Sequence, residues 1–415
     1  MDTLYTTRTD CRICHSPLRT VIDLGDIYLN NFVEEDTKDY PSAPLTLVVC
    51  TNPECELVQL EHTADLDKLY RQYWYQSGLN KGMVASLQNV VDDVMDHIPL
   101  QPGDVVIDIG CNDGTMLAQY PSNLYKVGFD PALNLEDKAK HHCNEFYNTY
   151  FDASLYLPYS DRVPTEPTPW KAAVITSIAM FYDLEDPNKF VEDIKKCLAP
   201  TGMWVIQLTD LVSMMKANAF DAICHEHLEY YSLKTICYLM KQHDLEVFDV
   251  STNDVNGGSI RVFVAFEGER DIRESVINHL QEERAYLESF EDPFDSFSSR
   301  VNNEDIALCE LVISELDKGK KIYALGASTK GNTLLQYYGL RSRYIPYAAE
   351  VNADKFGRRT VGTNIEIISE QEAIAHQPDY FLVLPWHFKD GIIKKVKEAG
   401  YKGKFILPLP EVKVI

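Results

Sequence analysis

The stretch that decides the fold is Val105-Val106-Ile107-Asp108-Ile109-Gly110-Cys111-Asn112-Asp113-Gly114-Thr115. It predicts a buried apolar strand, then a turn with two glycines, and then the start of a helix. Glycine lets the backbone approach a ligand closely, and such a turn brings the ligand to a helix N-terminus. The turn lacks the G-x-G-x-x-G spacing, so we do not expect NAD. Asp108, just before the turn, suits a cofactor that carries an amino-acid cation.

A second acidic residue supports a nucleoside ligand at this turn. Val127-Gly128-Phe129-Asp130 ends the next expected strand with a carboxylate placed to hold two ribose hydroxyls. S-adenosylmethionine has both a ribose and an amino-acid cation, so we predict that it is the cofactor. A purely structural βαβ turn is the alternative, and Asp130 with the later apolar strand 173–177 argues against it. The predicted cofactor-binding residues are Asp108, Gly110, Asn112, Asp113, Gly114 and Asp130.

Apolar runs alternate with amphipathic stretches along most of the chain, which indicates βαβ units and parallel sheets. In the middle of the chain, strands are expected at 105–109, 125–129, 172–177 and 203–208, with helices at 83–97 and 188–198. Further strands are expected at 260–266, 321–325, 344–348, 380–384 and 404–407. The character of the sequence changes near residues 68 and 255, where we place domain boundaries.

Two cysteine pairs occur in the first segment, Cys11-Arg12-Ile13-Cys14 and Cys50-Thr51-Asn52-Pro53-Glu54-Cys55. Four thiolates on tight turns are the ligands of a tetrahedral structural zinc. The gap in the second pair is wide, and His15 could replace one sulfur. Four unrelated buried cysteines or a redox pair are the alternatives, although no thioredoxin-like strand precedes the first pair. The predicted metal ligands are Cys11, Cys14, Cys50 and Cys55.

At 415 residues the chain is too long for one hydrophobic core. We predict an α/β protein in which a small zinc-binding domain (1–68) precedes two Rossmann-like α/β domains (69–255 and 256–415). The first residues lack a secretory signal, so we expect a cytoplasmic protein with reduced cysteines. No apolar stretch is long enough for a membrane span. The formal charge of −24 disfavours nucleic acid as the methyl acceptor and favours a small substrate, which can still be anionic.

A histidine-rich loop, Cys224-His225-Glu226-His227, follows the strand 203–208 and is followed by aromatic residues. It leaves the carboxyl end of the sheet, where ligands of α/β folds bind. The two histidines are two residues apart, so they cannot form an HExxH zinc site, which needs i, i+4 spacing on a helix. Taken alone, the cluster is also compatible with a polar structural turn.

The chain as a whole resembles the three-domain sugar C-methyltransferases, which build branched-chain deoxysugars from nucleotide-linked ketosugars. The resemblance runs nearly end to end through both cysteine pairs and the cofactor turn. Its further motifs are Tyr73-Trp74-Tyr75-Gln76-Ser77-Gly78, His225-Glu226-His227, Tyr230-Tyr231-Ser232, Asn256-Gly257-Gly258-Ser259-Ile260-Arg261 and Gly326-Ala327-Ser328-Thr329-Lys330-Gly331-Asn332-Thr333-Leu334-Leu335. One departure is Cys224, which stands where antibiotic-sugar members have a tyrosine.

The resemblance implies that His227 is a catalytic base and that Glu226 lies near the keto group. A base beside a ketone makes a carbon nucleophile through an enolate, which His225 or a tyrosine would stabilise. Glu226 and Tyr75 are the next candidates for the base. An O- or N-methyltransferase is the rival enzyme, and a non-catalytic protein with the cofactor fold is the rival outside enzymes.

The C-terminal turn Gly326-Ala327-Ser328-Thr329-Lys330-Gly331 follows an expected strand and could bind phosphate through its backbone and Lys330. A structural strand-to-helix turn is nearly as well supported. Glu350 ends the next strand, where dinucleotide folds carry a ribose-binding carboxylate, but no G-x-G-x-x-G accompanies it.

Overall fold

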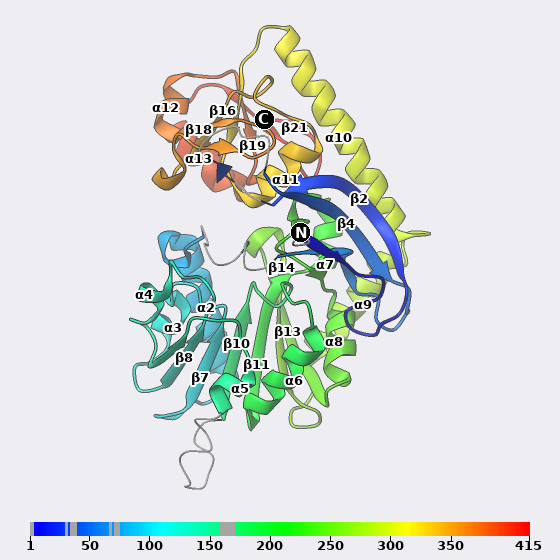
Figure 1. Cartoon of the computed structure of the whole chain (residues 1–415), viewed down its shortest axis with the longest axis vertical. Helices are drawn as coiled ribbons and strands as arrows, with labels where there is room; N and C mark the ends of the chain where they lie inside the picture. The colour runs from blue at the N-terminus through cyan, green and yellow to red at the C-terminus, as the bar shows by residue number, and fades with distance from the viewer. Residues whose placement is uncertain (1–3, 30–31, 34–39, 66–68, 70–74, 158–170) are drawn as a thin grey trace.

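The computed structural model describes residues 4–29, 32–33, 40–65, 69, 75–157 and 171–415. It confirms the predicted α/β class, with a small N-terminal sheet domain and two larger sheets flanked by helices (Figure 1). The expected boundary at residue 68 and the motif residues Tyr73 and Trp74 lie outside the described residues.

The central sheet has seven strands in the order β13-β14-β11-β10-β7-β8-β9. Five of them are parallel: β9 (Glu145–Tyr147), β8 (Tyr125–Phe129), β7 (Val105–Ile109), β10 (Ala172–Ile178) and β11 (Leu198–Thr209). The chain extends from β7 to β8 on one side and returns to β10 on the other. This change of direction is the switch point at which ligands bind in open α/β sheets.

Both faces of the central sheet are covered by helices. Val106 packs into a core with α2 (Lys81–His97) and α3 (Thr115–Gln119), whereas Ile107 faces the core beneath α6 (Pro187–Cys197) and α8 (Leu233–Lys241). Successive strand residues point to opposite faces, so a strand buried on both sides has apolar residues on both faces. This explains why the run 105–109 signals the centre of the sheet.

One expected strand belongs to a different sheet from the one predicted. Residues 260–266 were assigned to the third segment, but β14 (Ser259–Phe266) lies in the central sheet. It pairs antiparallel with β11 on one side and with β13 (Leu245–Asn253) on the other. The hairpin turn between β13 and β14 is short, and hairpin strands pair with each other. The position of the strand in sequence therefore did not identify its sheet.

The N-terminal segment forms an antiparallel sheet of β2 (Leu18–Tyr28), β4 (Ser42–Cys50) and β5 (Val58–Leu60). A separate pair joins β1 (Tyr5–Thr7) to β6 (His62–Ala64). The cysteine pairs lie where β2 begins and where β4 ends.

The C-terminal sheet has the order β21-β20-β19-β15-β16-β18-β17-β3. Its parallel strands are β20 (Lys404–Leu407), β19 (Tyr380–Val383), β15 (Ile322–Leu325), β16 (Tyr347–Glu350) and β18 (Glu366–Ser369). β21 (Lys413–Val414) and β17 (Arg359–Thr360) pair antiparallel at its two ends. The expected strand 344–348 begins three residues later because the amides of Tyr344 and Ile345 bond Arg341 in a turn and Pro346 has no N–H.

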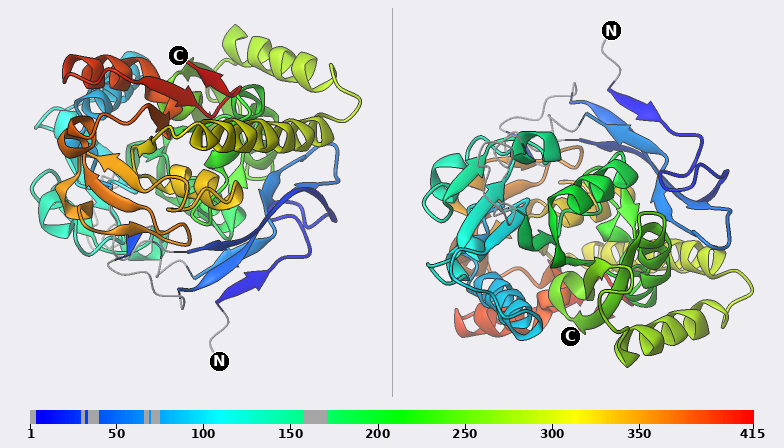
Figure 2. Two further views of the ribbon diagram at one scale, coloured as in Figure 1. Left: turned by 90° about the horizontal axis from the view of Figure 1, so that it is seen from above. Right: turned by 90° about the horizontal axis from the view of Figure 1, so that it is seen from below.

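The three segments are joined by shared strands. β3 (Phe32–Val33), from the N-terminal segment, pairs with β17 at the edge of the C-terminal sheet. β12 (Glu229–Tyr230), directly after the histidine loop, pairs with β5 of the N-terminal sheet. The long helix α10 (Pro293–Asp317) runs beside β2 toward the C-terminal sheet, which the views from above and below also show (Figures 1 and 2).

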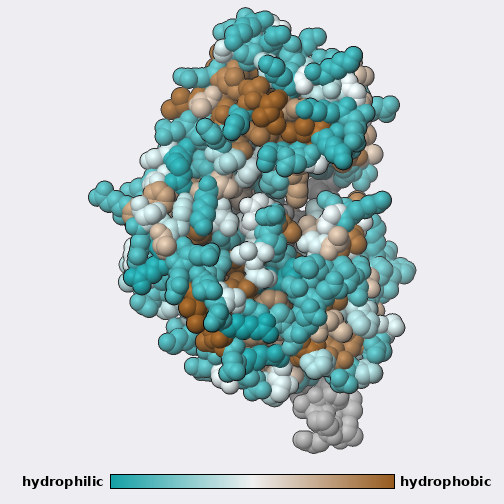
Figure 3. Space-filling model, turned by 180° about the vertical axis from the view of Figure 1, so that it is seen from behind, coloured by the Kyte–Doolittle hydropathy of each residue, from teal (hydrophilic) through white to brown (hydrophobic). Residues whose placement is uncertain are grey.

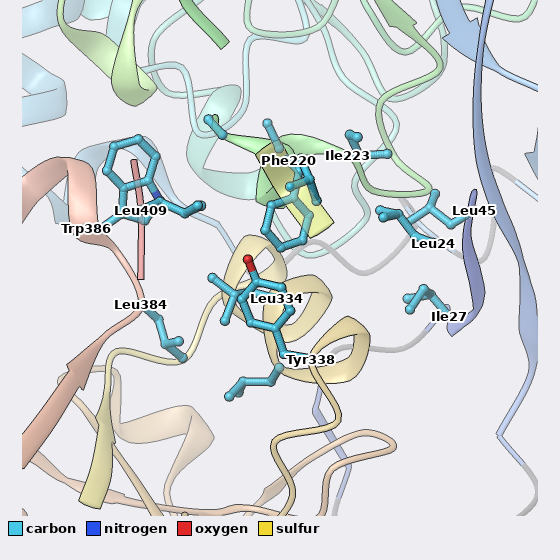
Figure 4. Close-up of a cluster of buried hydrophobic side chains, with 14 of the residues drawn as sticks. Leu24, Ile27, Leu45, Phe220, Ile223, Leu334, Tyr338, Leu384, Trp386 and Leu409 are labelled. Atoms are coloured by element: carbon cyan, nitrogen blue, oxygen red, sulfur yellow. The ribbon is translucent and has the colours of Figure 1, made fainter. Parts of the chain in front are cut away.

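One hydrophobic core crosses all three segments. Ile27 from β2, Phe220 from the short helix η3 (Phe220–Ala222) and Leu334 from α11 (Thr329–Tyr337) belong to the same buried cluster (Figure 4). Removing this apolar surface from water stabilises the contact between segments by about 25 cal/mol per Å². The histidine loop begins directly after η3, so the core holds the start of the loop.

The face seen in Figure 3 is largely hydrophilic, with separate apolar patches. Within the described part of the chain, no helix is both long and apolar enough to cross a membrane.

Candidate active site

The turn after β7 has the backbone shape that its glycines permit. Gly110, Asn112 and Gly114 have φ angles of 72°, 54° and 79°, in the left-handed region. A Cβ atom at Gly110 would lie 3.0 Å from Cγ of Met180, so a larger residue would not fit without movement. The turn therefore requires glycine both for its conformation and for space.

Asp130, the residue after β8, holds this turn in place through hydrogen bonds. Its carboxylate accepts hydrogen bonds from the backbone N–H groups of Asn112, at 2.8 Å, and Ala132, at 2.9 Å. Burial raises the pKa of Asp130 to about 6, and the charge of Asp113 acts in the same direction. The carboxylate is thus oriented at the sheet edge in an environment that disfavours its own negative charge.

Asp108 lies deeper, at the end of β7, with 2% of its surface exposed. Its Oδ1 accepts a hydrogen bond from Oγ1 of Thr176 on β10 at 2.7 Å. Burial raises the pKa of Asp108 to about 7, and the charge of Asp130 raises it further. Two carboxylates whose pKa values are raised by burial and by neighbouring negative charge fit a ligand that brings positive charge, as S-adenosylmethionine does.

The Tyr75-Gln76-Ser77-Gly78 segment docks on the same turn. The Asn112 side chain accepts from the Ser77 N–H at 3.0 Å and donates to the Tyr75 carbonyl at 3.1 Å, and Asp113 accepts from the Gly78 N–H at 2.8 Å. The Tyr75 ring is 43% exposed, and its pKa is raised to about 12 by burial and by the charge of Asp113. The structure thus brings the predicted Tyr75 next to the predicted cofactor turn.

His227 is held in one tautomer by the backbone. Its Nδ1 lies 3.1 Å from the carbonyl oxygen of Ala222, which can only accept, so Nδ1 carries the proton and Nε2 has the lone pair. The ring packs against Tyr182 with centroids 4.3 Å apart. Burial and the charge of Lys330 lower the pKa of His227 to about 3, so the ring is neutral at physiological pH.

The neighbouring His225 has a different environment. It is 3% exposed, and its Nε2 lies 3.2 Å from the carbonyl oxygen of Ile27 on β2, while burial lowers its pKa to about 4. This contact ties the histidine loop to the N-terminal sheet. Cys224 is buried and its backbone N–H donates to the hydroxyl of Tyr230 at 3.3 Å, whereas Glu226 is only half-buried.

The C-terminal domain approaches the loop through Lys330, which the sequence analysis named only as a phosphate-binding candidate, and through Trp386 and His387, which it missed. Nε1 of Trp386 donates to Asp221, a buried residue just before the loop, at 3.0 Å. Lys330 lies close enough to lower the pKa of both His227 and His387, to about 3 in each case together with burial. Nothing in the sequence indicates this convergence, because these residues come from separate domains.

The Gly326 turn has its own carboxylate brace. Glu350, at the end of β16, accepts from the Ala327 N–H at 3.1 Å, and Lys355 lies 3.5 Å from the same carboxylate. Ser328 caps α11 by accepting from the Gly331 N–H at 3.1 Å. A Cβ atom on Gly326, whose φ is 89°, would lie 2.7 Å from Cδ of Pro385.

The four cysteines of the N-terminal segment form one cluster. Their sulfur atoms all lie within 4.8 Å of one another, with 3.7 Å between Cys11 and Cys55 and 3.4 Å between Cys14 and Cys50. Tetrahedral zinc with bonds of about 2.3 Å separates its sulfurs by about 3.8 Å, so the donor set fits zinc. His15 lies outside this group, with a side chain that is 68% exposed and beside Asp10.

The cysteine cluster is connected to the histidine loop through Arg12. Its buried guanidinium donates to the carbonyl of Leu60 at 2.7 Å and to the hydroxyl of Thr63 at 2.7 Å. Its Nε lies 3.5 Å from Glu229, two residues after His227. The N-terminal domain therefore contacts the loop through Ile27 and the strand directly after the loop through Arg12.

Comparisons with known families cover all three segments. A "C-methyltransferase C-terminal domain" matches residues 254–410, a "Methyltransferase domain" matches 83–250, and a zinc binding domain matches 11–70. The chain is 32% identical over 413 residues to the C-methyltransferase NovU of Streptomyces niveus, an alignment that covers 98% of this chain and 96% of NovU. The chain belongs to the three-domain C-methyltransferases. It is an S-adenosylmethionine-dependent enzyme, as the cofactor turn predicts.

Solved structures resemble parts of this C-methyltransferase. An S-adenosylmethionine-dependent methyltransferase of Clostridium acetobutylicum aligns with a TM-score of 0.34 and 11% identity, over 45% of this chain and 92% of that one. The N-methyltransferase NodS of Bradyrhizobium japonicum aligns with a TM-score of 0.32 and 11% identity, over 44% of this chain and 95% of NodS.

Proposed function

We propose that this C-methyltransferase methylates the carbon next to the ketone of a nucleotide-linked ketosugar, with His227 as the base. The observation that supports this role is the fixed tautomer of His227, whose Nδ1–H bonds the Ala222 carbonyl and leaves Nε2 as a proton acceptor. The carbon beside a ketone is acidic because the charge left by the proton collects on oxygen as an enolate. A positioned base accelerates such a step by about 10²–10⁴-fold.

Lys330 links the base to an anionic substrate. Burial, and after it the charge of Lys330, lowers the pKa of His227 to about 3, which is low for a base that works at neutral pH. A phosphate bound beside Lys330 would offset that charge, the smaller of the two causes, and so raise the pKa of His227. A nucleotide-linked substrate would thereby activate the base that acts on it, whereas a neutral metabolite would not.

Asp108 and Asp130 are the residues that would hold the methyl donor. Bound S-adenosylmethionine supplies an electrophilic methyl group on a sulfonium sulfur. Asp130 would bind the ribose hydroxyls and Asp108 would favour the positive charge of the amino-acid end, because each carboxylate is oriented by the hydrogen bonds described above. The docked Tyr75–Gly78 segment would then cover the turn and exclude water.

The contact of His225 with Ile27 supports an anchoring role for this residue, since its Nε2 is directed at the N-terminal sheet. Glu226, which is less buried, remains the second candidate for a residue near the keto group.

The cysteine cluster would hold one structural zinc. A site closed by four protein sulfurs has no position for substrate, so the metal would stabilise the N-terminal domain. Metal analysis of freshly purified protein should find one equivalent of zinc that is lost in a Cys11→Ser/Cys55→Ser double variant, whatever metal other sites hold. A full-length protein with less than half an equivalent of zinc would contradict this assignment.

Hydrogen exchange tests the proposed base directly. The wild-type enzyme, given a ketosugar nucleotide and S-adenosylhomocysteine in D₂O, should incorporate deuterium at the carbon beside the ketone. His227→Asn should not, whereas His141→Asn, which changes an exposed histidine, should exchange like the wild type. NMR of the recovered sugar gives the position of the label.

The outcome also separates the rival reactions. Exchange that survives in His227→Asn assigns the base to another residue, and Glu226→Gln is the next variant to measure. Methyl transfer without any exchange in wild type, observed with the reduced alcohol as well as with the ketone, would establish an oxygen or nitrogen acceptor and overturn the proposal.

A further inference from the structure

A separate cavity of about 330 Å³ lies beside Asp210, the residue that follows β11. It is bounded by α7 (Leu211–Lys216), by the β13–β14 hairpin and by α9 (Glu274–Leu287). Gly258 of the hairpin has a φ of 123° and approaches α7 so closely that a Cβ atom there would lie 2.8 Å from Cβ of Ser213. The hairpin carries the Asn256–Arg261 motif, which the cofactor site and the histidine loop do not use.

Three potential metal ligands meet in this cavity. Side-chain donor atoms of Asp210, His279 and Glu283 all lie within 4.8 Å of one another, and Nε2 of His279 is 3.5 Å from Oε1 of Glu283. His279 and Glu283 are one helical turn apart on α9, so both side chains project from the same face. Asp210 directly follows β11 and is the N-cap of α7.

Two of these groups have an atom that could ligate a metal and that has no hydrogen-bond partner among the described residues. Oδ2 of Asp210 accepts from the N–H and hydroxyl of Ser213, at 2.8 and 2.7 Å. Among the described residues, neither Oδ1 of Asp210 nor Nε2 of His279 has a hydrogen-bond partner, although both atoms are buried. Asp210 is 3% exposed, and a buried polar atom without a partner costs about 1–3 kcal/mol.

Glu283 is also buried, at 3% exposed, and is already oriented by the backbone. It accepts from the N–H groups of Leu233 and Lys234 at the start of α8, at 2.6 and 3.2 Å. Its position beside a second buried carboxylate is unfavourable unless positive charge lies between them. A cation in contact with Asp210 Oδ1 and His279 Nε2 would satisfy both atoms and reduce the repulsion.

We propose that Asp210, His279 and Glu283 bind a divalent first-row transition-metal ion. Two carboxylates and an imidazole are donors that suit Mn²⁺, Fe²⁺ or Zn²⁺, and ligands about 2.1 Å from one ion are separated by 3.5 Å at a near-tetrahedral angle. The cavity has space for water molecules to complete the coordination. The ion would tie α7 and α9 to the start of α8, and α7 leads directly into η3 and the histidine loop.

Manganese titration of the full-length protein tests the site. Mn²⁺ prefers oxygen and nitrogen donors, so it distinguishes this site from the four-cysteine cluster. The electron paramagnetic resonance signal of free Mn²⁺ should fall by one equivalent per chain, and Zn²⁺ should compete. Asp210→Asn and His279→Ala should each weaken binding at least about tenfold, while Glu282→Gln, which removes an exposed acid from the same cavity, should not.

Several outcomes would overturn the assignment. Absence of stoichiometric Mn²⁺ binding in wild type would do so, as would binding that survives in both variants. A His279 ring that stays protonated at pH 8 and is unaffected by Mn²⁺ would mean that an imidazolium bridges the two carboxylates instead. If a variant does not fold, NMR of the wild type replaces it: Mn²⁺ bound at this site should broaden the His279 ring resonances, and unchanged resonances would overturn the assignment. None of these measurements depends on the sugar substrate.

Discussion

The turn that follows β7 and the turn that follows β15 have similar backbone geometry and similar hydrogen bonding. In each, a carboxylate at the end of the neighbouring parallel strand accepts a hydrogen bond from a backbone N–H of the turn: Asp130 from Asn112, and Glu350 from Ala327. Each turn starts with a glycine of positive φ that leaves no space for a side chain.

Their electrostatic environments differ. Lys355 lies beside Glu350 and also donates to the carbonyl of Ala327 at 2.8 Å, so the second turn is closed by a cation of the chain. Burial raises the pKa values of Asp108 and Asp130, and the charges of other carboxylates raise them further. Similar backbone geometry therefore serves two purposes: the first turn suits a cationic cofactor, and the second positions Lys330 near His227.

The largest effect is expected from His227, which belongs to neither turn. His227→Ala should lower turnover by about 10²–10⁴-fold, since it removes a positioned base. Calorimetry should find unchanged S-adenosylmethionine affinity. A comparable loss of cofactor affinity would mean that the loop and the first turn act as one unit.

The second turn is tested by Lys330→Met. The loss of a charge-assisted contact of about 1.5–3 kcal/mol should lower the affinity for a nucleotide sugar by roughly 10–100-fold. The affinity for the free nucleoside diphosphate, measured by calorimetry, should fall in parallel, with cofactor affinity unchanged. Equal binding by wild type and variant would show that the second turn is purely structural.

The first turn is tested by the matched pair Asp130→Ala and Glu350→Ala. Asp130→Ala should lower the affinity for S-adenosylmethionine by about tenfold or more, because hydrogen bonds to a charged group are lost. Glu350→Ala removes the corresponding brace from the other turn and should lower thermal stability without changing cofactor affinity. If both variants bind the cofactor equally, the electrostatic distinction between the turns is wrong.

The smallest expected effect is a pH dependence. The pKa of Asp108 is about 7 in the folded protein, so its carboxylate forms as the pH rises from 6 to 8, and affinity for a cationic cofactor should rise by up to about tenfold. In the protein without cofactor, the folding stability changes with pH in the opposite direction. The unfolded chain loses this proton near pH 4, so the contribution of Asp108 to folding falls as the pH rises from about 4 through 7.

Asp108→Asn should flatten the pH dependence of cofactor binding and remove that part of the stability profile. Titration calorimetry and thermal unfolding across this pH range measure the two effects. An affinity that falls with rising pH in the wild type would contradict the assignment of Asp108.

The cofactor turn and the cysteine pairs could be predicted because their residues are close in sequence. The hydrophobic run 105–109, the glycines and Asp130 belong to one strand–turn–helix–strand unit, whose geometry follows from local backbone preferences and short connections. The four cysteines come from two tight turns, and the structure brings all their sulfur atoms together.

The surroundings of the histidine loop were decided only by the tertiary structure. Ile27, Trp386 and Lys330 reach the loop from three separate parts of the chain, through strand pairing and a core shared by all segments. β14 was predicted as a strand, yet its sheet was not, because pairing partners depend on long-range contacts. The sequence by itself determined the local turns and their chemistry. Burial and neighbouring charge, which exist only after folding, determined the pKa values of Asp108 and His227.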